Sequence, residues 1–182
     1  MEMVRLLEAQ RGVKEGKNLQ ETFQLRKFNS DDLEQVVHIN RLCLPENYTN
    51  YFFVELHKRF PETFLVAEEN GKIVGYMMCR IEKGLSGFRG IIKKGHVVSI
   101  AVLPSHQHKG IGRALMMKAM ENMGLYNTKL CFLEVRVSNK AAVKLYKNLG
   151  FKVTRVIRSY YVDSEDAYVM SRELPFKLTS VS

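Results

Sequence analysis

A short glycine-containing turn in the middle of the chain has the residue types of an anion-binding site. It reads Gln-His-Lys-Gly-Ile-Gly-Arg over residues 107–113 and joins an apolar run, residues 95–103, to a helical pattern. Glycine lets the backbone approach a ligand closely, and the start of a helix presents unpaired amide N–H groups that bind phosphate. The spacing matches neither a Walker A loop nor a GxGxxG dinucleotide fingerprint, and a tight strand-to-helix turn would use the same glycines.

The distribution of charge favours an anionic ligand on one half of the molecule. The chain has 28 basic and 19 acidic side chains, a net charge of +9. Residues 83–158 hold 15 basic and two acidic side chains, whereas residues 28–82 hold five basic and nine acidic ones. A basic excess over the whole chain would suggest nucleic acid or ribosome contact, but a positive field confined to one half suggests an anionic ligand there. A solvated basic face would have the same composition.

Length and composition indicate one globular domain. The chain has 182 residues, of which 46% are hydrophobic and 26% charged, and these values exclude wholesale disorder. Its apolar runs are far shorter than the ~20 residues that a membrane span needs, and its first residues lack the apolar core of a secretory signal. Cys43, Cys79 and Cys131 have no close metal-ligand spacing, so we expect three reduced thiols in a cytoplasmic protein.

Hydrophobic periodicity predicts a mixed α/β sheet in the order β-α-α-β-β-β-α-β-α-β-β. Ser30 is the expected N-cap of the first helix, Asn70-Gly71 predicts a hairpin, and residues 84–95 are expected to form a loop. The domain is expected over residues 23–174, between an N-terminal extension, 1–22, and a C-terminal tail, 175–182. The expected strands are 23–27, 63–69, 72–80, 95–103, 129–137, 151–158 and 167–172, and the expected helices are 30–40, 51–59, 110–123 and 139–149.

Two motifs separated by one predicted strand resemble the GNAT superfamily of acyl-CoA N-acyltransferases. The turn at 107–113 is similar to the family's Q/R-x-x-G-x-G/A signature, and Asn139 to Tyr146, followed by Leu149-Gly150-Phe151, resembles its second signature. The resemblance covers about residues 22–174 and implies the GNAT fold, a mixed and mostly antiparallel central sheet flanked by helices.

Four further segments resemble the catalytic subunits of the N-terminal (Nα) acetyltransferases, most closely archaeal and ribosomal-protein-alanine-acetyltransferase-like members. They are Leu-Pro-Glu-Asn-Tyr at 44–48, Gly-His-Val-Val-Ser-Ile-Ala-Val at 95–102, Leu-Glu-Val-Arg-Val-Ser-Asn at 133–139 and Tyr-Tyr-Val-Asp-Ser-Glu-Asp-Ala-Tyr at 160–168. Ser164 stands where the family more often has glycine. The resemblance implies direct transfer of acetyl from acetyl-CoA to the α-amine of a protein N-terminus, without an acyl-enzyme.

The resemblance also implies which residues hold acetyl-CoA. Backbone amides of the turn would bind the pyrophosphate, strand residues 100–102 would pair with pantetheine, and Val102 N–H would stabilise the oxyanion. The implied cofactor residues are Ile100, Ala101, Val102, His108, Lys109, Gly110, Ile111, Gly112, Arg113, Asn139, Tyr146 and Lys147.

Deprotonation of the amine requires a base, and two residues are candidates. An α-amine has a pKa near ~8 and a lysine amine near ~10.4, so an Nα substrate needs only a modest base. Glu46 and His96 are the catalytic candidates, acting through ordered water. A solvated loop carboxylate and a structural histidine are the competing interpretations. The resemblance makes the Tyr146 phenol the proton donor to the departing thiolate, whereas a core tyrosine would have the same helical spacing.

The acceptor side is expected to hold Tyr48, Glu134, Tyr160 and Tyr161, because tyrosine is large, rigid and polar at its tip. His96 and Glu134 fall short of the three or four ligands of a metal site, so we expect no metal.

The expected partners are protein or peptide N-termini and, through the basic charge, the ribosome; no membrane or sequence-specific nucleic-acid contact is expected. The alternatives are a lysine or small-molecule amine acetyltransferase and a non-catalytic, ribosome-associated binding module. The preferred first residue and the oligomeric state stay open.

Overall fold

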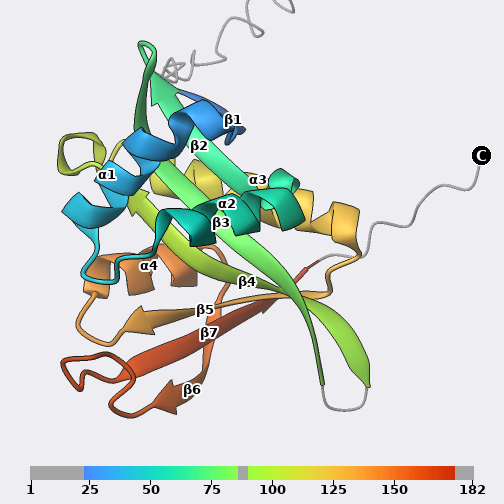
Figure 1. Ribbon diagram of the computed structural model, residues 1–182. Coiled ribbons are helices and arrows are strands. Elements are labelled where there is room, and N and C mark those ends of the chain that lie inside the picture. Colours follow the sequence, from blue (N-terminus) through green and yellow to red (C-terminus); the bar gives the residue numbers. More distant parts are fainter. Residues whose placement is uncertain (1–22, 86–89, 175–182) are drawn as a thin grey trace, which may run out of the picture.

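The computed structural model describes residues 23–85 and 90–174, which form a twisted seven-stranded sheet between two pairs of helices (Figure 1). The expected extension, 1–22, and tail, 175–182, lie outside the described residues. The sheet order is β1-β2-β3-β4-β5-β7-β6, and β4 with β5 is its one parallel pair within the described chain. The strands are β1 (Gln24–Lys27), β2 (Phe64–Glu69), β3 (Lys72–Leu85), β4 (Ile91–Val102), β5 (Leu130–Arg136), β6 (Lys152–Ile157) and β7 (Ala167–Glu173).

Alternating side chains of the central strands belong to two separate hydrophobic cores, one on each face of the sheet. On one face, α1 (Leu33–Cys43) and α2 (Asn50–Arg59) pack against Tyr76 and Met78. On the other face, α3 (Ile111–Met123) and α4 (Lys140–Asn148) pack against Met77 and Cys79. This two-sided covering explains why β2 and β3 carry nearly continuous apolar runs. The expected mixed, mostly antiparallel sheet and the expected order of its helices and strands are confirmed.

The first helix begins differently from the prediction that Ser30 caps it. Asn29 is the capping residue, with extended backbone and a side-chain oxygen that accepts a hydrogen bond from the Asp31 N–H. Asp32 closes a capping box by accepting from the Asn29 N–H at 2.9 Å. Residues 30–32 therefore form a single 3-10 turn, and α1 itself starts at Leu33.

The hairpin of β3 and β4 is longer than predicted. Residues 84–95 were expected to form a loop, but β3 continues to Leu85 and β4 begins at Ile91. The register pairs Lys83 with Lys93 and Leu85 with Ile91. Glycine and lysine are poor strand formers by propensity, but the cross-strand backbone ladder extends through them. The hairpin projects beyond the rest of the sheet (Figure 1).

The parallel strands β4 and β5 diverge after three residue pairs. They pair only from Lys94 with Leu130 to His96 with Phe132, whereas β4 stays on β3 as far as Val102. A bulge at Val98 accompanies the divergence, because Cys79 pairs with Val97 and Met78 with Ser99. The sheet therefore opens into a fork between β4 and β5. No helix among the described residues is long and apolar enough to span a membrane.

Candidate active site

The fork exposes backbone groups of β4 that the sheet does not use. The Leu103 N–H donates to the Val74 carbonyl at 2.9 Å, and this hydrogen bond shows which alternate residues of β4 bond to β3. In an antiparallel pair the alternate residues point away from the partner strand. The main-chain groups of Ile100 and Val102 therefore face the fork, and those of Ala101 face β3. An extended ligand in the fork could pair with the first two as an added strand.

His96 and Glu134 meet where the strands separate. The His96 Nε2 and Glu134 Oε2 atoms are 2.7 Å apart, and the two side chains are only 12% and 15% exposed. The imidazole stacks on the Phe132 ring with centroids 4.5 Å apart. Its Nδ1 is buried without a hydrogen-bond partner in the described part of the chain. A neutral histidine that donates a hydrogen bond from Nε2 carries its lone pair on Nδ1. His96 and Glu134 therefore have the arrangement of a histidine base whose second ring nitrogen is hydrogen-bonded to a carboxylate.

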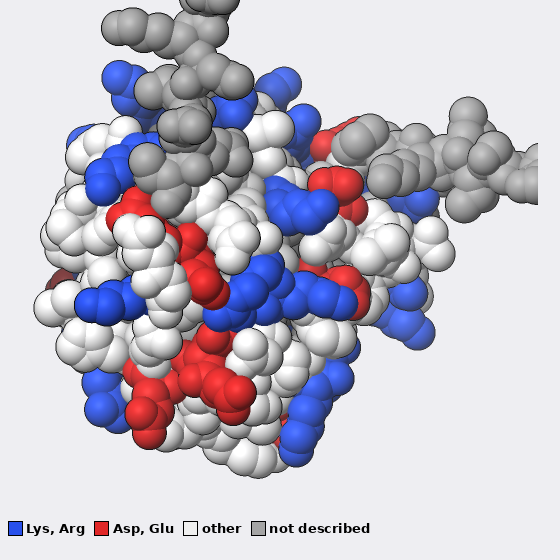
Figure 2. Space-filling view, turned by 90° about the horizontal axis from the view of Figure 1, so that it is seen from above, with Lys and Arg blue, Asp and Glu red and all other residues white. Residues whose placement is uncertain are grey.

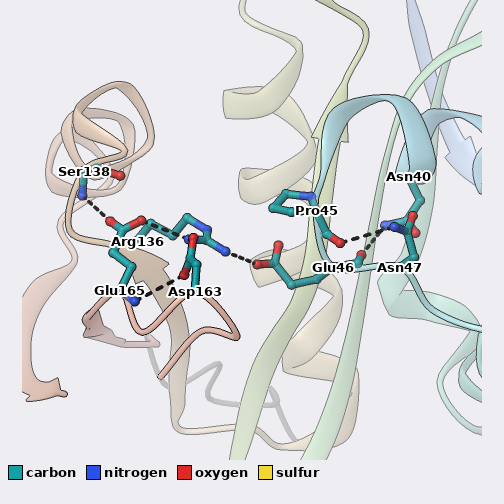
Figure 3. Close-up of polar contacts among 8 residues, drawn as sticks. All are labelled: Asn40, Pro45, Glu46, Asn47, Arg136, Ser138, Asp163 and Glu165. Carbon is teal, nitrogen blue, oxygen red and sulfur yellow. Dashed lines mark hydrogen bonds and ion pairs between the residues drawn. The ribbon is translucent and has the colours of Figure 1, made fainter. Parts of the chain in front are cut away.

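Glu46 lies in the loop of residues 44–49 between α1 and α2, which we call the acceptor loop. Its carboxylate accepts a hydrogen bond from Arg136 Nη2 at 2.7 Å, across 90 positions of sequence (Figure 3). Hydrogen bonds between guanidinium and carboxylate groups are among the stronger ones in proteins. Glu46 is therefore held as the partner of a cation, whereas His96 keeps an unbound ring nitrogen.

Arg136 also binds the loop between β6 and β7. Its Nη1 donates to Asp163 at 2.7 Å and to Glu165 at 2.9 Å (Figure 3). Its guanidinium carbon lies 3.9 Å from the centroid of the Tyr161 ring. Burial opposes this charge, but hydrogen bonds to the three carboxylates raise the pKa of Arg136 above its ordinary value. One arginine thus ties the acceptor loop to the β6–β7 loop.

The carboxylates of the β6–β7 loop are strongly acidic. Hydrogen bonds from Ser138, followed by those from Arg136, lower the pKa of Glu165 to about 2. The Glu165 backbone N–H and then Arg136 lower the pKa of Asp163. Both groups are therefore ionised at neutral pH, as their pairing with Arg136 requires.

The tyrosines expected on the acceptor side lie in one cluster around these ions. The Tyr48 hydroxyl donates to the Val98 carbonyl at 3.3 Å, at the bulge of β4. Tyr160 and Tyr161 pack edge to face with centroids 5.0 Å apart. Burial raises the pKa of Tyr48 and of Tyr160, and Glu134 contributes to both shifts. These side chains and the His96–Glu134 pair therefore share one site on the α1–α2 face of the sheet.

The glycine turn lies at the start of α3 and shows the features of an anion cradle. Gly110 has φ +86° with no atom within 4 Å of where its Cβ would be, and His108 also has positive φ. The Gln107 side chain donates to the Val102 carbonyl at 3.1 Å and fixes the turn to the end of β4. The Ile111 side chain is buried in the core at the first position of α3. Exposed Lys109 and Arg113 flank the cradle.

The second signature places its residues on α4, beside this cradle. A Cβ at Gly112 would lie 3.6 Å from the Leu145 side chain, so the start of α3 touches α4. Asn139 caps α4 through its side-chain oxygen, which accepts from the Ala142 N–H at 3.0 Å and leaves its NH₂ group for a ligand. Lys147 is exposed in the last turn.

Tyr146 is buried in the core, 6% exposed. Burial, and secondarily Cys131, raise the pKa of Tyr146 well above its ordinary value. The phenol therefore stays protonated at neutral pH.

Sequence reasoning did not single out Arg136, Asp163 or Glu165. All three lie inside segments quoted for the family resemblance, but no local pattern marks an ion pair that spans 27 or more positions. Asn40 on α1 and Ser99 on β4 were also missed, and their polarity within apolar runs was the available signal. The described part of the chain holds no group of three or more His, Cys, Asp or Glu side chains placed to bind a metal.

Comparison with known proteins agrees with this geometry. A model of the acetyltransferase (GNAT) family matches residues 33–151. The N-alpha-acetyltransferase of Sulfurisphaera tokodaii is 50% identical over 156 residues, which cover 84% of this chain and 93% of that protein. The crystal structure of Ard1 from Thermoplasma volcanium has a TM-score of 0.76 at 30% identity, covering 85% of this chain and 99% of that one. Naa50 of Arabidopsis thaliana, solved with the bisubstrate analogue CoA-Ac-MVNAL, has a TM-score of 0.72 at 27% identity, covering 83% and 98%.

The chain belongs to the acetyltransferase (GNAT) family. The seven strands and four helices of its described residues form the GNAT fold, as the sequence motifs predicted.

Proposed function

We propose that the protein is an N-alpha-acetyltransferase, which moves the acetyl group of acetyl-CoA directly to the α-amine of a protein N-terminus. The observation that carries this conclusion is the fork between β4 and β5, with an anion cradle on the α3–α4 face and a tyrosine-lined, ion-paired site on the α1–α2 face. The 50% identity to an archaeal N-alpha-acetyltransferase supports the same acceptor class.

Acetyl-CoA fits the cradle, and when bound it supplies a thioester carbonyl carbon that an amine can attack. The backbone of residues 108–113 would bind the pyrophosphate through amide N–H groups that the first turn of α3 leaves unpaired. Ile100 and Val102 would pair with pantetheine along the fork, and Val102 N–H would donate to the thioester oxygen. Asn139 and Lys147 would add polar contacts from α4.

His96 is the base that the geometry favours. Its Nδ1, which has no hydrogen-bond partner in the described part of the chain, would take a proton from the α-amine through ordered water. Glu134 would accept the hydrogen bond from Nε2 and stabilise the imidazolium that forms. Glu46, bound to Arg136, would act by holding the acceptor loop and by facing the positively charged α-amine with negative charge.

Tyr146 would donate its phenolic proton to the departing sulfur. The raised pKa keeps this proton in place until negative charge develops nearby. On the opposite face, Tyr48, Tyr160 and Tyr161 would wall the pocket of the first residue and bond to the peptide backbone.

A paired-peptide assay with the full chain tests the proposal against its alternatives. One peptide has a free α-amine and no lysine, and its match has an acetylated N-terminus and one lysine. We expect CoA release and a mass gain of one acetyl group only with the first peptide. Acetylation of the second would indicate a lysine acetyltransferase, and no CoA release with either would indicate a binding module. A library varying the first two residues then defines the preference.

We further propose that the protein meets its acceptors in the cytoplasm as they leave the ribosome. The net charge of +9 over the whole chain supports this placement. Acidic and basic side chains lie side by side on the face shown in Figure 2. Co-sedimentation with ribosomes at low and high salt tests the proposal, and a free fraction that is independent of salt would contradict it.

A further inference from the structure

Three buried polar side chains from three different elements form a chain beneath the acceptor loop. Tyr76 Oη on β3 lies 2.7 Å from Ser99 Oγ on β4 and 2.9 Å from Asn40 Nδ2 on α1. Asn40 and Tyr76 are 0% exposed and Ser99 is 6% exposed. Polar groups at such depth cost free energy unless they are hydrogen-bonded, so each member of the chain depends on the next.

One hydrogen-bond direction in this chain follows from the chemistry of the groups. The amide nitrogen of Asn40 can only donate, so the Tyr76 oxygen accepts from it. The Tyr76 and Ser99 hydroxyls share the next hydrogen bond, in which either oxygen can be the donor. Burial, offset in part by these two hydrogen bonds, raises the pKa of Tyr76 to about 12, so the phenol is neutral at neutral pH.

The chain ends on the backbone of the acceptor loop. Asn40 Nδ2 also donates to the Glu46 carbonyl at 3.2 Å, and Asn40 Oδ1 accepts from the Tyr48 N–H at 3.4 Å. One amide therefore holds the backbone on both sides of Asn47, in the way that a neighbouring strand would. The contact fixes the loop at the two residues whose side chains enter the acceptor site.

The contacts close into a ring. The Tyr48 hydroxyl returns to the Val98 carbonyl on β4, and Val98 precedes Ser99, where the chain began. The ring thus links the strand that borders the fork to the loop that carries Glu46 and Tyr48. A change at Tyr76 would be transmitted to both sides of the acceptor pocket, while the cradle at the start of α3 has no hydrogen bond to the ring in the described chain.

We propose that Asn40, Tyr76 and Ser99 are positioning residues that set the acceptor loop against β4. The proposal rests on the proposed function and deepens it: these residues touch no substrate, and they determine how well the pocket fits the peptide. Their loss should weaken acceptor binding and leave acetyl-CoA binding unchanged.

The test compares Tyr76→Phe with a matched buried variant. Tyr76→Phe removes the hydroxyl and keeps the ring, which packs against Phe53 at 6.1 Å. Thr63→Val removes another buried hydroxyl, which bonds to the Phe60 and Cys79 carbonyls, both at 3.3 Å, away from the acceptor loop. Loss of a hydrogen bond of ordinary strength predicts a roughly fivefold rise in peptide KM for Tyr76→Phe. The acetyl-CoA KM should change less than about twofold, and Thr63→Val should leave both KM values near wild type.

Two further measurements keep the proposal falsifiable. Ser99→Ala should raise peptide KM in the same direction by a smaller factor. Hydrogen exchange should be faster across residues 44–49 in Tyr76→Phe than in Thr63→Val. Equal peptide KM values in the two variants, equal exchange of the loop, or a matching rise in acetyl-CoA KM would each overturn the proposal. A wild-type chain that acetylates no peptide would instead refute the proposed function, and the exchange comparison would still decide the positioning role.

Discussion

Replacing Glu134 by glutamine tests the His96–Glu134 pair most directly. Glutamine keeps an oxygen that can accept the hydrogen bond from His96 Nε2, so the imidazole stays in place on Phe132. The substitution removes only the negative charge that would stabilise the imidazolium as the amine loses its proton. Any loss of rate therefore reports electrostatics at the base.

The structure sets the size of the effect. The interacting atoms are 2.7 Å apart and the side chains are 12% and 15% exposed, so solvent screens the pair only in part. Unit charges about 4 Å apart interact by about 1 kcal/mol in water and about 4 kcal/mol at an effective dielectric constant of about 20. If the full interaction develops in the transition state, kcat should fall between about fivefold and about a thousandfold.

The assay is CoA release with a saturating peptide that carries a free α-amine. Glu121→Gln, on the exposed surface of α3, is the charge-matched control and should retain wild-type kcat. Because His96 and Glu134 act as one unit, adding Glu134→Gln to His96→Gln should cost little more than His96→Gln alone. Retention of more than half of wild-type kcat by Glu134→Gln would refute the assigned role of the carboxylate.

Three further predictions follow from other parts of the structure. Tyr146→Phe should lower kcat by roughly tenfold or more because it removes the proton donor, while calorimetry should show nearly unchanged affinity for acetyl-CoA. Gly95→Ala should destabilise the fold by about 1–3 kcal/mol, or about 3–9 °C in Tm, measured by circular dichroism. The cause is that a Cβ there would clash with the Met123 sulfur, at a fully buried position. The Glu165 pKa of about 2 lies below its unfolded value, so this carboxylate stabilises the fold above about pH 4.3, and the contribution is lost as pH falls toward 2. Thermal melts from pH 6 to pH 2.5 should therefore show a smaller fall in Tm for Glu165→Gln than for wild type.

Each of these predictions has a clear contrary result. Unchanged kcat in Tyr146→Phe would remove its assigned role, and a wild-type Tm in Gly95→Ala would mean that Met123 moves aside without cost. Identical acid profiles for wild type and Glu165→Gln would show that the hydrogen bonds of Glu165 with Ser138 and Arg136 do not contribute to stability. Met123→Ala, introduced together with Gly95→Ala, separates the steric clash from a backbone effect because it removes the contacting sulfur.

The sequence alone determined the parts of the protein that depend on neighbouring residues. Gly110 allows the left-handed turn before α3, Asn70-Gly71 forms the hairpin between β2 and β3, and apolar periodicity sets the order of helices and strands. These features follow from backbone conformation and side-chain pattern within a few residues. The prediction was wrong where local signals competed. Asn29, and not Ser30, caps the first helix through its side-chain hydrogen bond, and backbone pairing extends the β3–β4 hairpin to Leu85 and Ile91.

Only the tertiary structure decided how the candidate catalytic residues are paired. The sequence left open whether Glu46 or His96 is the dominant base, since both types can take a proton. Folding brings Arg136 to Glu46 across 90 positions and Glu134 to His96 across 38, and thereby gives the two groups different surroundings. Coulombic and hydrogen-bond interactions depend on distance in space, and a linear pattern carries no record of which charges the folded sheet and its loops place within 3 Å of each other.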